Sequence, residues 1–300
     1  MKLWVLFLLF ISINLSASDC TTKFVDTTFM PKNNNQNQHN WCVFWSSADL
    51  YSFYEKTPLS SYDMALQYFN NDLVRNQSEV NDHTEIPAVM GAALVIAQQG
   101  KGLCLEAQTN YTNSDWAELS FLFQKISSNE KSLKTIICEN NLESSKPFNE
   151  IPKNILNIIN KLSGDKKASA LLDITCGKRH QLAKYGVGTR AIENFSEEKI
   201  MDKLDQLLQS EVPSSVSYDW DFIINDKDFT KKESNHSSTI IGRKLNPETN
   251  QCEYLIKDTA GNRCPKNTIY KCDPQNGTIW VPRENLQKNI YEVNWLVKSK

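Results

Sequence analysis

Cys42 is the residue of this sequence best placed for nucleophilic chemistry. Residues 31–40 are polar and rich in asparagine, which predicts a loop, whereas residues 43–54 carry apolar and aromatic side chains at roughly helical spacing. A thiol at the start of a helix is stabilised as a thiolate by free backbone N–H groups and by the helix dipole. In the preceding loop, the side-chain amides of Gln36 and Gln38 could donate a hydrogen bond to an oxyanion.

His236 and Asp258 are the two residues that could activate this thiol. His236 stands at the head of a predicted strand (237–242), and Asp258 follows the next predicted strand (252–257). A turn at 246–250 predicts a hairpin, which can bring these two strand ends together. An imidazole can take the proton of a thiol, and a carboxylate on its other nitrogen can orient the ring. Taken singly, His236 is equally typical of an edge strand and Asp258 of a turn.

The cysteines offer another interpretation of Cys42, as half of a disulfide bond. The chain has eight cysteines: Cys20, Cys42, Cys104, Cys138, Cys176, Cys252, Cys264 and Cys272. An exported chain is expected to oxidise its pairs, and if Cys42 stays free at least one other cysteine must also be unpaired. We expect structural bridges between Cys104 and Cys138 and within the group Cys252, Cys264 and Cys272. Because there is neither a Cys-x-x-Cys nor a His-x-x-x-His motif, no metal site is expected.

The N-terminus has the pattern of a secretory signal peptide. Lys2 is followed by an apolar run from Leu3 to Leu15 and then by Ser16, Ala17 and Ser18. The run is short for a membrane span, so we expect cleavage after Ser18, or after Ala17, and no stable membrane insertion. The predicted location is therefore the periplasm or the exterior of the cell.

Composition and elements together predict an α+β chain. Hydrophobic residues make up 40% of the sequence and charged residues 23%, which is enough for a substantial core. The first half favours helices and the last third favours antiparallel strands, so we expect two lobes with the site in the cleft between them. The predicted helices cover 46–73 (with a break at Pro58), 88–97, 116–126, 151–162 and 197–209, and the predicted strands cover 212–218, 237–242, 252–257, 278–281 and 290–297.

Charge and motifs also exclude some functions. The net charge of −2, with no basic stripe, gives no reason to expect nucleic acid as a partner. The absence of a glycine-rich phosphate loop removes the usual signal for nucleotides. We therefore expect a protein or peptide as the substrate and no cofactor, and the sequence leaves the oligomeric state open.

Several segments resemble the papain-like cysteine peptidases. Gln36 and Cys42 followed by a helix resemble the family's Gln-x-x-x-x-x-Cys block. His236-Ser-Ser-Thr-Ile-Ile-Gly242 is similar to its His-Ala-x-x-x-x-Gly segment, and Ile256-Lys-Asp-Thr-Ala-Gly261 to its Ile-Lys-Asn-Ser-Trp-Gly segment. Two further segments are similar to family members, 100–106 to the part before the substrate-binding loop and 280–286 to the tail of exported bacterial members.

The resemblance implies both an activity and a domain plan. Cys42 would be the nucleophile, His236 the general base and acid, Asp258 the residue orienting His236, and Gln36 the oxyanion donor. A papain-like domain would follow the signal peptide (1–18) and fill residues 19–300. It would have a helical lobe at about 42–125, an insertion at about 110–210 and a β lobe at about 212–300. The insertion would explain why Cys42 and His236 are further apart than the family's usual ~130–150 residues.

The sequence also departs from the family's pattern. Asp258 stands where the family has asparagine, and Ala260 stands where it has a tryptophan that shields the polar contact from water. Val43 replaces the aromatic residue that usually follows the nucleophile. These changes leave two alternatives open: a catalytically inactive module that binds protein or peptide in the cleft, and a transglutaminase-like acyl transferase, which an aspartate at 258 favours.

Overall fold

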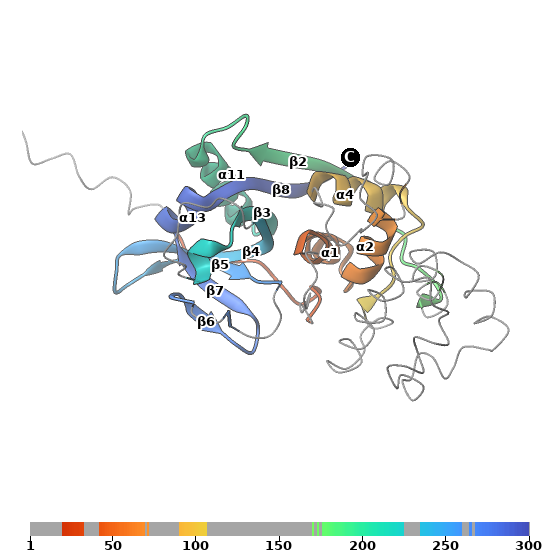
Figure 1. The fold of residues 1–300 in the computed structure, drawn as a ribbon, viewed down its shortest axis with the longest axis horizontal. Coiled ribbons are helices and arrows are strands. Elements are labelled where there is room, and N and C mark those ends of the chain that lie inside the picture. The colour runs from red at the N-terminus through yellow and green to blue at the C-terminus, as the bar shows by residue number, and fades with distance from the viewer. Residues whose placement is uncertain are drawn as a thin grey trace, which may run out of the picture.

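The computed structural model describes residues 20–32, 42–69, 71, 90–106, 170, 173, 176–224, 235–259, 264–265 and 268–299. In this part of the chain, one end of the molecule is helical, and an antiparallel sheet with helices of its own forms the other end (Figure 1). The predicted signal peptide, Gln36, Gln38, Cys138, Ala260 and the predicted helices at 116–126 and 151–162 lie outside the described residues.

Helix α1 (Cys42–Glu55) lies between the two lobes (Figure 1). It packs against strand β4 on one side and against helices α2 (Ser61–Phe69) and α4 (Met90–Gln99) on the other. All its residues from Cys42 to Ser52 are buried, because a helix covered on every side exposes no polar face. The predicted helices at 46–73 and 88–97 therefore exist, with the break near Pro58 that the sequence indicated.

The second lobe is built on one eight-stranded sheet. Its order is β2-β8-β3-β4-β5-β7-β6, with β1 also paired to β4, and every pairing is antiparallel. The strands are β1 (Lys23–Phe24), β2 (Tyr185–Ala191), β3 (Ser214–Asp219), β4 (Asn235–Asn246), β5 (Gln251–Lys257), β6 (Lys271–Asp273), β7 (Thr278–Pro282) and β8 (Ile290–Lys298). All five strands predicted from the sequence are present, whereas β1, β2 and β6 were not predicted. Strands β1 and β6 are only two and three residues long, and β2 contains two glycines, a residue depleted in strands.

Three helices belong to the sheet lobe: α11 (Glu197–Gln209), α12 (Asp221–Ile224) and α13 (Arg283–Asn289). Helix α11 has the predicted bounds, and the Ser196 side chain accepts a hydrogen bond from the Lys199 N–H at its N-terminus. Its buried side chains pack into the same core as those of β3, β4 and β5. Together with β2, α11 occupies the C-terminal part of the segment that the sequence suggested as an insertion.

The buried residues form two separate cores, one per lobe. The helical core contains Phe44, Leu50 and Leu94, and the sheet core contains Val216, Ile240 and Ile256. Two cores joined by a buried helix confirm the predicted α+β two-lobe architecture.

Three disulfide bonds are present in the described part of the chain, two of them between segments far apart in sequence. They join Cys20 to Cys252, Cys104 to Cys176, and Cys264 to Cys272. The expected bridge within the last three cysteines exists, but the predicted Cys104–Cys138 bridge is wrong. Cys176 reaches Cys104 because 176–180 lies against 102–104, where Leu103 and His180 exchange backbone hydrogen bonds.

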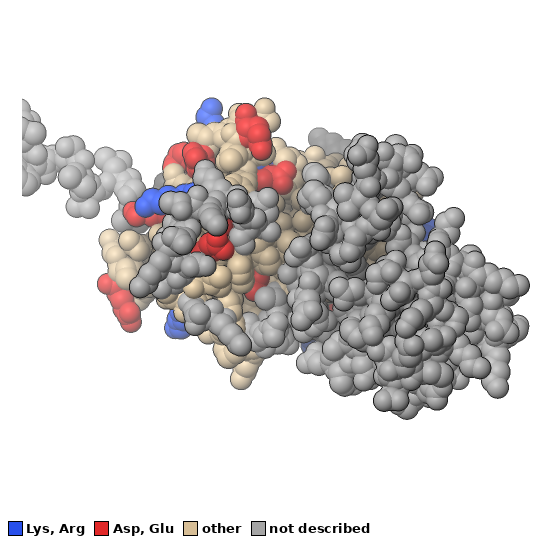
Figure 2. All heavy atoms as spheres, viewed as in Figure 1, with Lys and Arg blue, Asp and Glu red and all other residues tan. Residues whose placement is uncertain are grey.

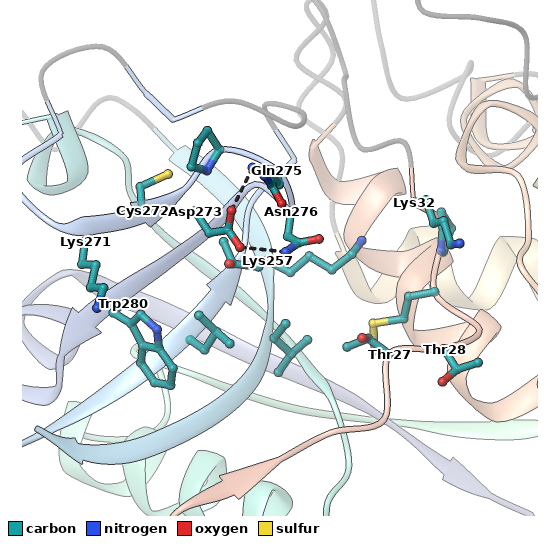
Figure 3. A pocket seen from close by; sticks show the side chains of 16 residues that line it. Thr27, Thr28, Lys32, Lys257, Lys271, Cys272, Asp273, Gln275, Asn276 and Trp280 are labelled. Carbon is teal, nitrogen blue, oxygen red and sulfur yellow. Dashed lines mark hydrogen bonds between the residues drawn. The ribbon is translucent and has the colours of Figure 1, made fainter.

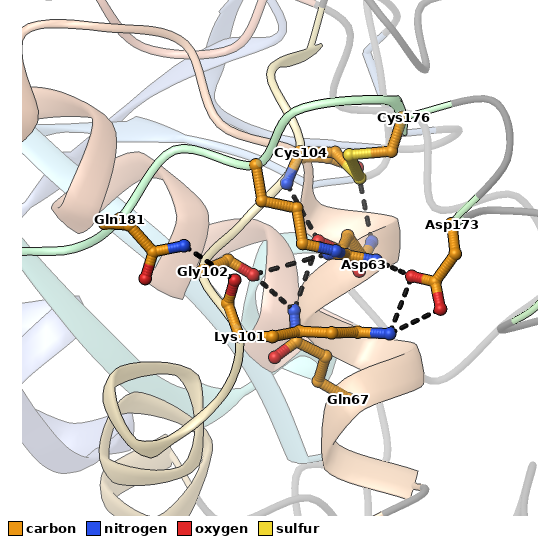
Figure 4. The surroundings of a disulfide bond; sticks show 10 residues. Asp63, Gln67, Lys101, Gly102, Cys104, Asp173, Cys176 and Gln181 are labelled. Atoms are coloured by element: carbon orange, nitrogen blue, oxygen red, sulfur yellow. Dashed lines mark hydrogen bonds and ion pairs between the residues drawn. A yellow bond between two sulfur atoms is a disulfide. The ribbon is translucent and has the colours of Figure 1, made fainter.

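The surroundings of the Cys104–Cys176 bridge are strongly polar (Figure 4). Asp63 accepts a hydrogen bond from the Cys104 N–H at 2.8 Å and forms an ion pair with Arg179. Asp173 accepts from Lys101 and from Arg179. These contacts anchor the segment around Cys176 to α2 and to the turn after α4.

Charges of both signs are distributed over the described surface. Figure 2 shows Lys and Arg beside Asp and Glu over the sheet lobe, in keeping with the net charge of −2. Among the described residues, no helix is both long and apolar enough to cross a membrane.

Candidate active site

Cys42 is the first residue of α1 and is buried, with 7% of its surface exposed. It is the only free cysteine among the described residues, so the alternative of a half-cystine at this position is wrong. The backbone N–H groups of Val43 and Ser237 donate to its sulfur. The helix start and strand β4 therefore both supply donors that stabilise a thiolate.

His236 and Asp258 meet as the predicted hairpin requires. His236 is the second residue of β4, and Asp258 comes directly after β5. The His236 Nε2–H donates to Asp258 Oδ1 at 2.9 Å, and both side chains are buried. The sulfur of Cys42 is hydrogen-bonded to the same imidazole. Since Nε2 is occupied by Asp258, Nδ1 is the ring nitrogen left for the thiol.

The structure thus brings together three of the four residues singled out in the sequence: Cys42 from α1, His236 from β4 and Asp258 from the end of β5. Gln36, the fourth, lies outside the described residues.

The contact between thiol and imidazole determines their ionisation. Burial would raise the pKa of Cys42, but the charge of His236, its hydrogen bond and the two backbone N–H groups outweigh burial and lower the pKa. Burial would likewise lower the pKa of His236, but the Cys42 thiolate and the hydrogen bond to Asp258 raise it to about 10. Both shifts favour a thiolate–imidazolium pair over a neutral thiol beside a neutral imidazole.

This pairing predicts an alkylation profile for Cys42. The reactive thiolate forms as pH rises through the lowered pKa of Cys42, so reaction with iodoacetamide should already be fast well below pH 8.5, the ordinary pKa of a cysteine. In His236→Ala the charge and the hydrogen bond of the imidazole are lost and only the two backbone N–H groups oppose burial, so the reactive form should appear at a higher pH than in the unmodified protein. The rate of alkylation between pH 4 and 10, with the modified residue identified by mass spectrometry, tests this; identical profiles for the two proteins would contradict it.

Oδ1 of Asp258 is the centre of a buried hydrogen-bond network. Besides His236, its Oδ1 accepts from the Ser238 hydroxyl at 3.3 Å and from the Thr259 N–H at 2.8 Å. The hydroxyl of Tyr218 lies 2.9 Å from Ser238 Oγ and extends this buried network into β3. The other oxygen, Oδ2, is buried and has no hydrogen-bond partner among the described residues, so the polar contacts of this carboxyl group converge on Oδ1.

Trp220 is a residue of the site that the sequence did not reveal. It follows β3, and its ring centroid lies 4.4 Å from that of His236, with an angle of 50° between the planes. Tyr218 meets the same imidazole edge-on at 5.6 Å. Nothing in the local pattern around Trp220 indicates this contact, because it depends on the pairing of β3 with β4 in a register that sets Tyr218 opposite His236.

A buried ion pair lies behind these three groups. Lys257 Nζ donates to both carboxylate oxygens of Asp49, at 2.7 and 2.9 Å, and the Thr239 hydroxyl donates to Asp49 at 2.8 Å. Asp49 lies two turns after Cys42 on α1, Thr239 follows His236 on β4, and Lys257 precedes Asp258. The three elements that carry the site are therefore tied together a second time, in the buried interface between the lobes.

One cavity of the described structure lies beside this ion pair and not at Cys42. It measures about 1010 Å³ and is lined by 27–32, by residues of β5 to β7 and by the turn at 274–276 (Figure 3). Lys257 lines it, whereas Cys42, His236 and Asp258 do not. We place the site by its chemistry, because the residues that flank these three in sequence, at 33–41, 225–234 and 260–263, lie outside the described part.

Within the described residues, no group of three His, Cys, Asp or Glu side chains is arranged to hold a metal ion. The chemistry available at Cys42 is that of a charged nucleophile beside a proton donor, which is the arrangement for acyl transfer.

Sequence comparisons give no relative: no family model matches the chain, and no curated protein matches it. Structure comparison does find similar folds. One is the Amb a 11 cysteine protease, a major ragweed pollen allergen, in its proform, with a TM-score of 0.50 and 10% identity over 96% of this chain and 71% of that one. Another is PepW from Lactobacillus rhamnosis HN001, at 10% identity over 93% and 82% of the two chains, with a TM-score of 0.44. At such identities the likeness of the first extends to the fold alone, which is the two-lobe α+β fold.

Proposed function

We propose that this chain is an exported cysteine peptidase that hydrolyses peptide bonds through a thioester on Cys42. The observation that carries the proposal is the position of His236, hydrogen-bonded at once to a buried free thiol and to a buried carboxylate. A fold shared with a cysteine protease supports it. Three disulfide bonds support export, since such bonds persist in oxidising compartments.

The proposed reaction has two halves. The Cys42 thiolate attacks the peptide carbonyl carbon, a C–S bond forms, and the backbone N–H at the start of α1, with Gln36, stabilises the oxyanion. The His236 imidazolium donates its proton to the leaving nitrogen, and the C–N bond breaks. A water molecule, deprotonated by His236, then attacks the thioester; the C–S bond breaks and the carboxylic acid product leaves. Asp258 keeps Nε2 protonated throughout, so that Nδ1 faces the sulfur.

Incubation of the purified protein with a diverse peptide library tests the proposal. We expect new peptide termini in the mass spectra, and their loss when Cys42 has first been blocked with iodoacetamide. Cleavage that persists after blocking would contradict the mechanism. Tight binding of peptides without cleavage would indicate the inactive binding module instead.

The transglutaminase-like alternative has one observation in its favour, the aspartate at 258. It predicts that a primary amine, rather than water, takes the acyl group from the thioester. Adding a labelled amine together with a glutamine-containing protein distinguishes the two reactions: label incorporated into the protein supports transfer, and new termini without label support hydrolysis.

A further inference from the structure

The imidazole ring of His236 is covered by an aromatic ring that comes from a third part of the chain. The indole of Trp220 lies within the range at which a cation and an aromatic face attract each other, about 6 Å between the charge and the ring centre. Trp220 is itself only partly buried, whereas His236 is 9% exposed. The indole therefore contacts the buried imidazole and is itself partly exposed to solvent.

The sequence after Asp258 offers no aromatic ring for such a contact at position 260. The residue that follows Thr259 is Ala260, whose methyl group is too small to shield a ring from water. Trp220 approaches instead from the end of β3, next to Tyr218, which is paired with His236 in the sheet. The backbone of β3 is thus fixed relative to His236 by the ladder of hydrogen bonds, and the indole is held over the ring.

We propose that Trp220 is a positioning residue, which holds the His236 ring in its orientation and stabilises the imidazolium through its π face. The catalytic consequence rests on the proposed function, but the effect on the imidazolium does not. The charged groups that face His236 are the Cys42 thiolate from α1 and the Asp258 carboxylate after β5; the Tyr218 phenol of β3 also faces it. Substituting Trp220 changes none of these charges, so its contribution can be measured separately.

The contribution has a definite sign and a definite place in the pH profile. Loss of the π face destabilises the imidazolium and lowers the pKa at which His236 deprotonates. By contrast, the imidazolium is present both before and after Cys42 ionises, so the pKa of Cys42 should not move for this reason. In the pH profile of the site, the acidic limb reports ionisation of Cys42 and the basic limb reports deprotonation of His236. Trp220→Leu should therefore shift the basic limb down by about one pH unit and leave the acidic limb in place.

The experiment is a titration of the full chain labelled with ¹⁵N-histidine. The chain has four histidines, and His236→Ala assigns the signal of interest. We expect the His236 pKa to fall by about one unit in Trp220→Leu and by less in Trp220→Phe, which keeps an aromatic face. The acidic limb is measured in parallel through the alkylation of Cys42.

Trp280→Leu is the matched control. Trp280 also carries a cation on its ring, Lys244 at 3.9 Å, and it packs edge-to-face on Phe24 in the same sheet. It makes no contact with His236 that the structure records, so the pKa of His236 should stay within about 0.2 units of that of the unmodified protein, well below the one-unit effect. An unchanged pKa in Trp220→Leu, or an equal shift in Trp280→Leu, would overturn the proposal.

A second measurement covers the case in which Trp220→Leu does not fold. Replacing all tryptophans by fluorinated tryptophans withdraws electron density from the ring faces with little change of shape. The pKa of His236 should then fall stepwise with each added fluorine, and a constant value would overturn the proposal. If the protein cleaves no peptide at all, the proposed function fails, but the titration of His236 still decides the role of Trp220. If the protein does cleave peptides, the basic limb of the pH profile of kcat/KM should shift by the same amount as the pKa of His236.

Discussion

Replacement of Cys42 by alanine should lower kcat for peptide hydrolysis by a factor of about 10⁴ or more, since the covalent route is lost altogether. Serine at the same position should be almost as poor, because an alcohol with a pKa far above that of a thiol gains little from the imidazolium beside it. His236→Ala should cost a similar factor, because the thiolate loses its counter-charge and the leaving nitrogen loses its proton donor. The combined variant should be little worse than either single one, since residues that act as a unit do not add.

The measurement is single-turnover and steady-state kinetics on the best peptide from the library. Ser46→Ala is a suitable control: Ser46 is also buried on α1, one turn after Cys42, but its hydroxyl donates only to backbone carbonyls of its own helix. We expect its kcat to stay within about threefold of the unmodified protein, because such a bond contributes little. Activity retained in Cys42→Ala would show that cleavage occurs elsewhere.

Breaking the ion pair between Asp49 and Lys257 should have the largest effect on stability. Their side chains are 1% and 9% exposed, so a change of one partner leaves a charge buried without its counter-charge. Lys257→Met should lower the free energy of unfolding by about 3–5 kcal/mol. The double variant Asp49→Leu, Lys257→Met should recover most of this loss, because neither charge is then buried.

Urea unfolding of the four proteins in this cycle gives the coupling free energy directly. Lys23→Met supplies the contrast, since the Lys23–Glu211 pair is 26% and 61% exposed and its loss should change the free energy of unfolding by no more than about 1 kcal/mol. Equal effects of Lys257→Met and Lys23→Met would mean that the interface between the lobes does not depend on the buried pair. A double variant as unstable as Lys257→Met would mean that packing, and not charge, accounts for the loss.

The Asp49–Lys257 pair and Trp220 should affect the reactivity of the site in different ways. Asp49 touches neither Cys42 nor His236 in the recorded contacts, yet it fixes α1 against the strands that carry His236 and Asp258. Its effect on reactivity is therefore indirect, through the relative placement of the lobes. The effect of Trp220 is direct, through the ring that it covers.

The sequence by itself determined the features that depend on neighbours along the chain. Cys42 begins a helix because a polar, asparagine-rich sequence gives way to a helical pattern there. His236 and Asp258 lie together because a single turn joins β4 to β5 and sets Thr239 opposite Lys257. Periodicity likewise located α11 and the five predicted strands, since each of these elements is repetitive enough to be recognised locally.

Only the tertiary structure decided which distant side chains meet. The contact of Trp220 with His236 depends on the register of β3 against β4, and the Asp49–Lys257 pair depends on how α1 packs against β4, the neighbour of β5 in the sheet. The partner of Cys104 was decided by the strand-like pairing of 103 with 180, which no spacing of cysteines encodes. The physical reason is the same in each case: such contacts form between segments far apart in sequence, and their geometry is set by packing of the whole chain rather than by local propensity.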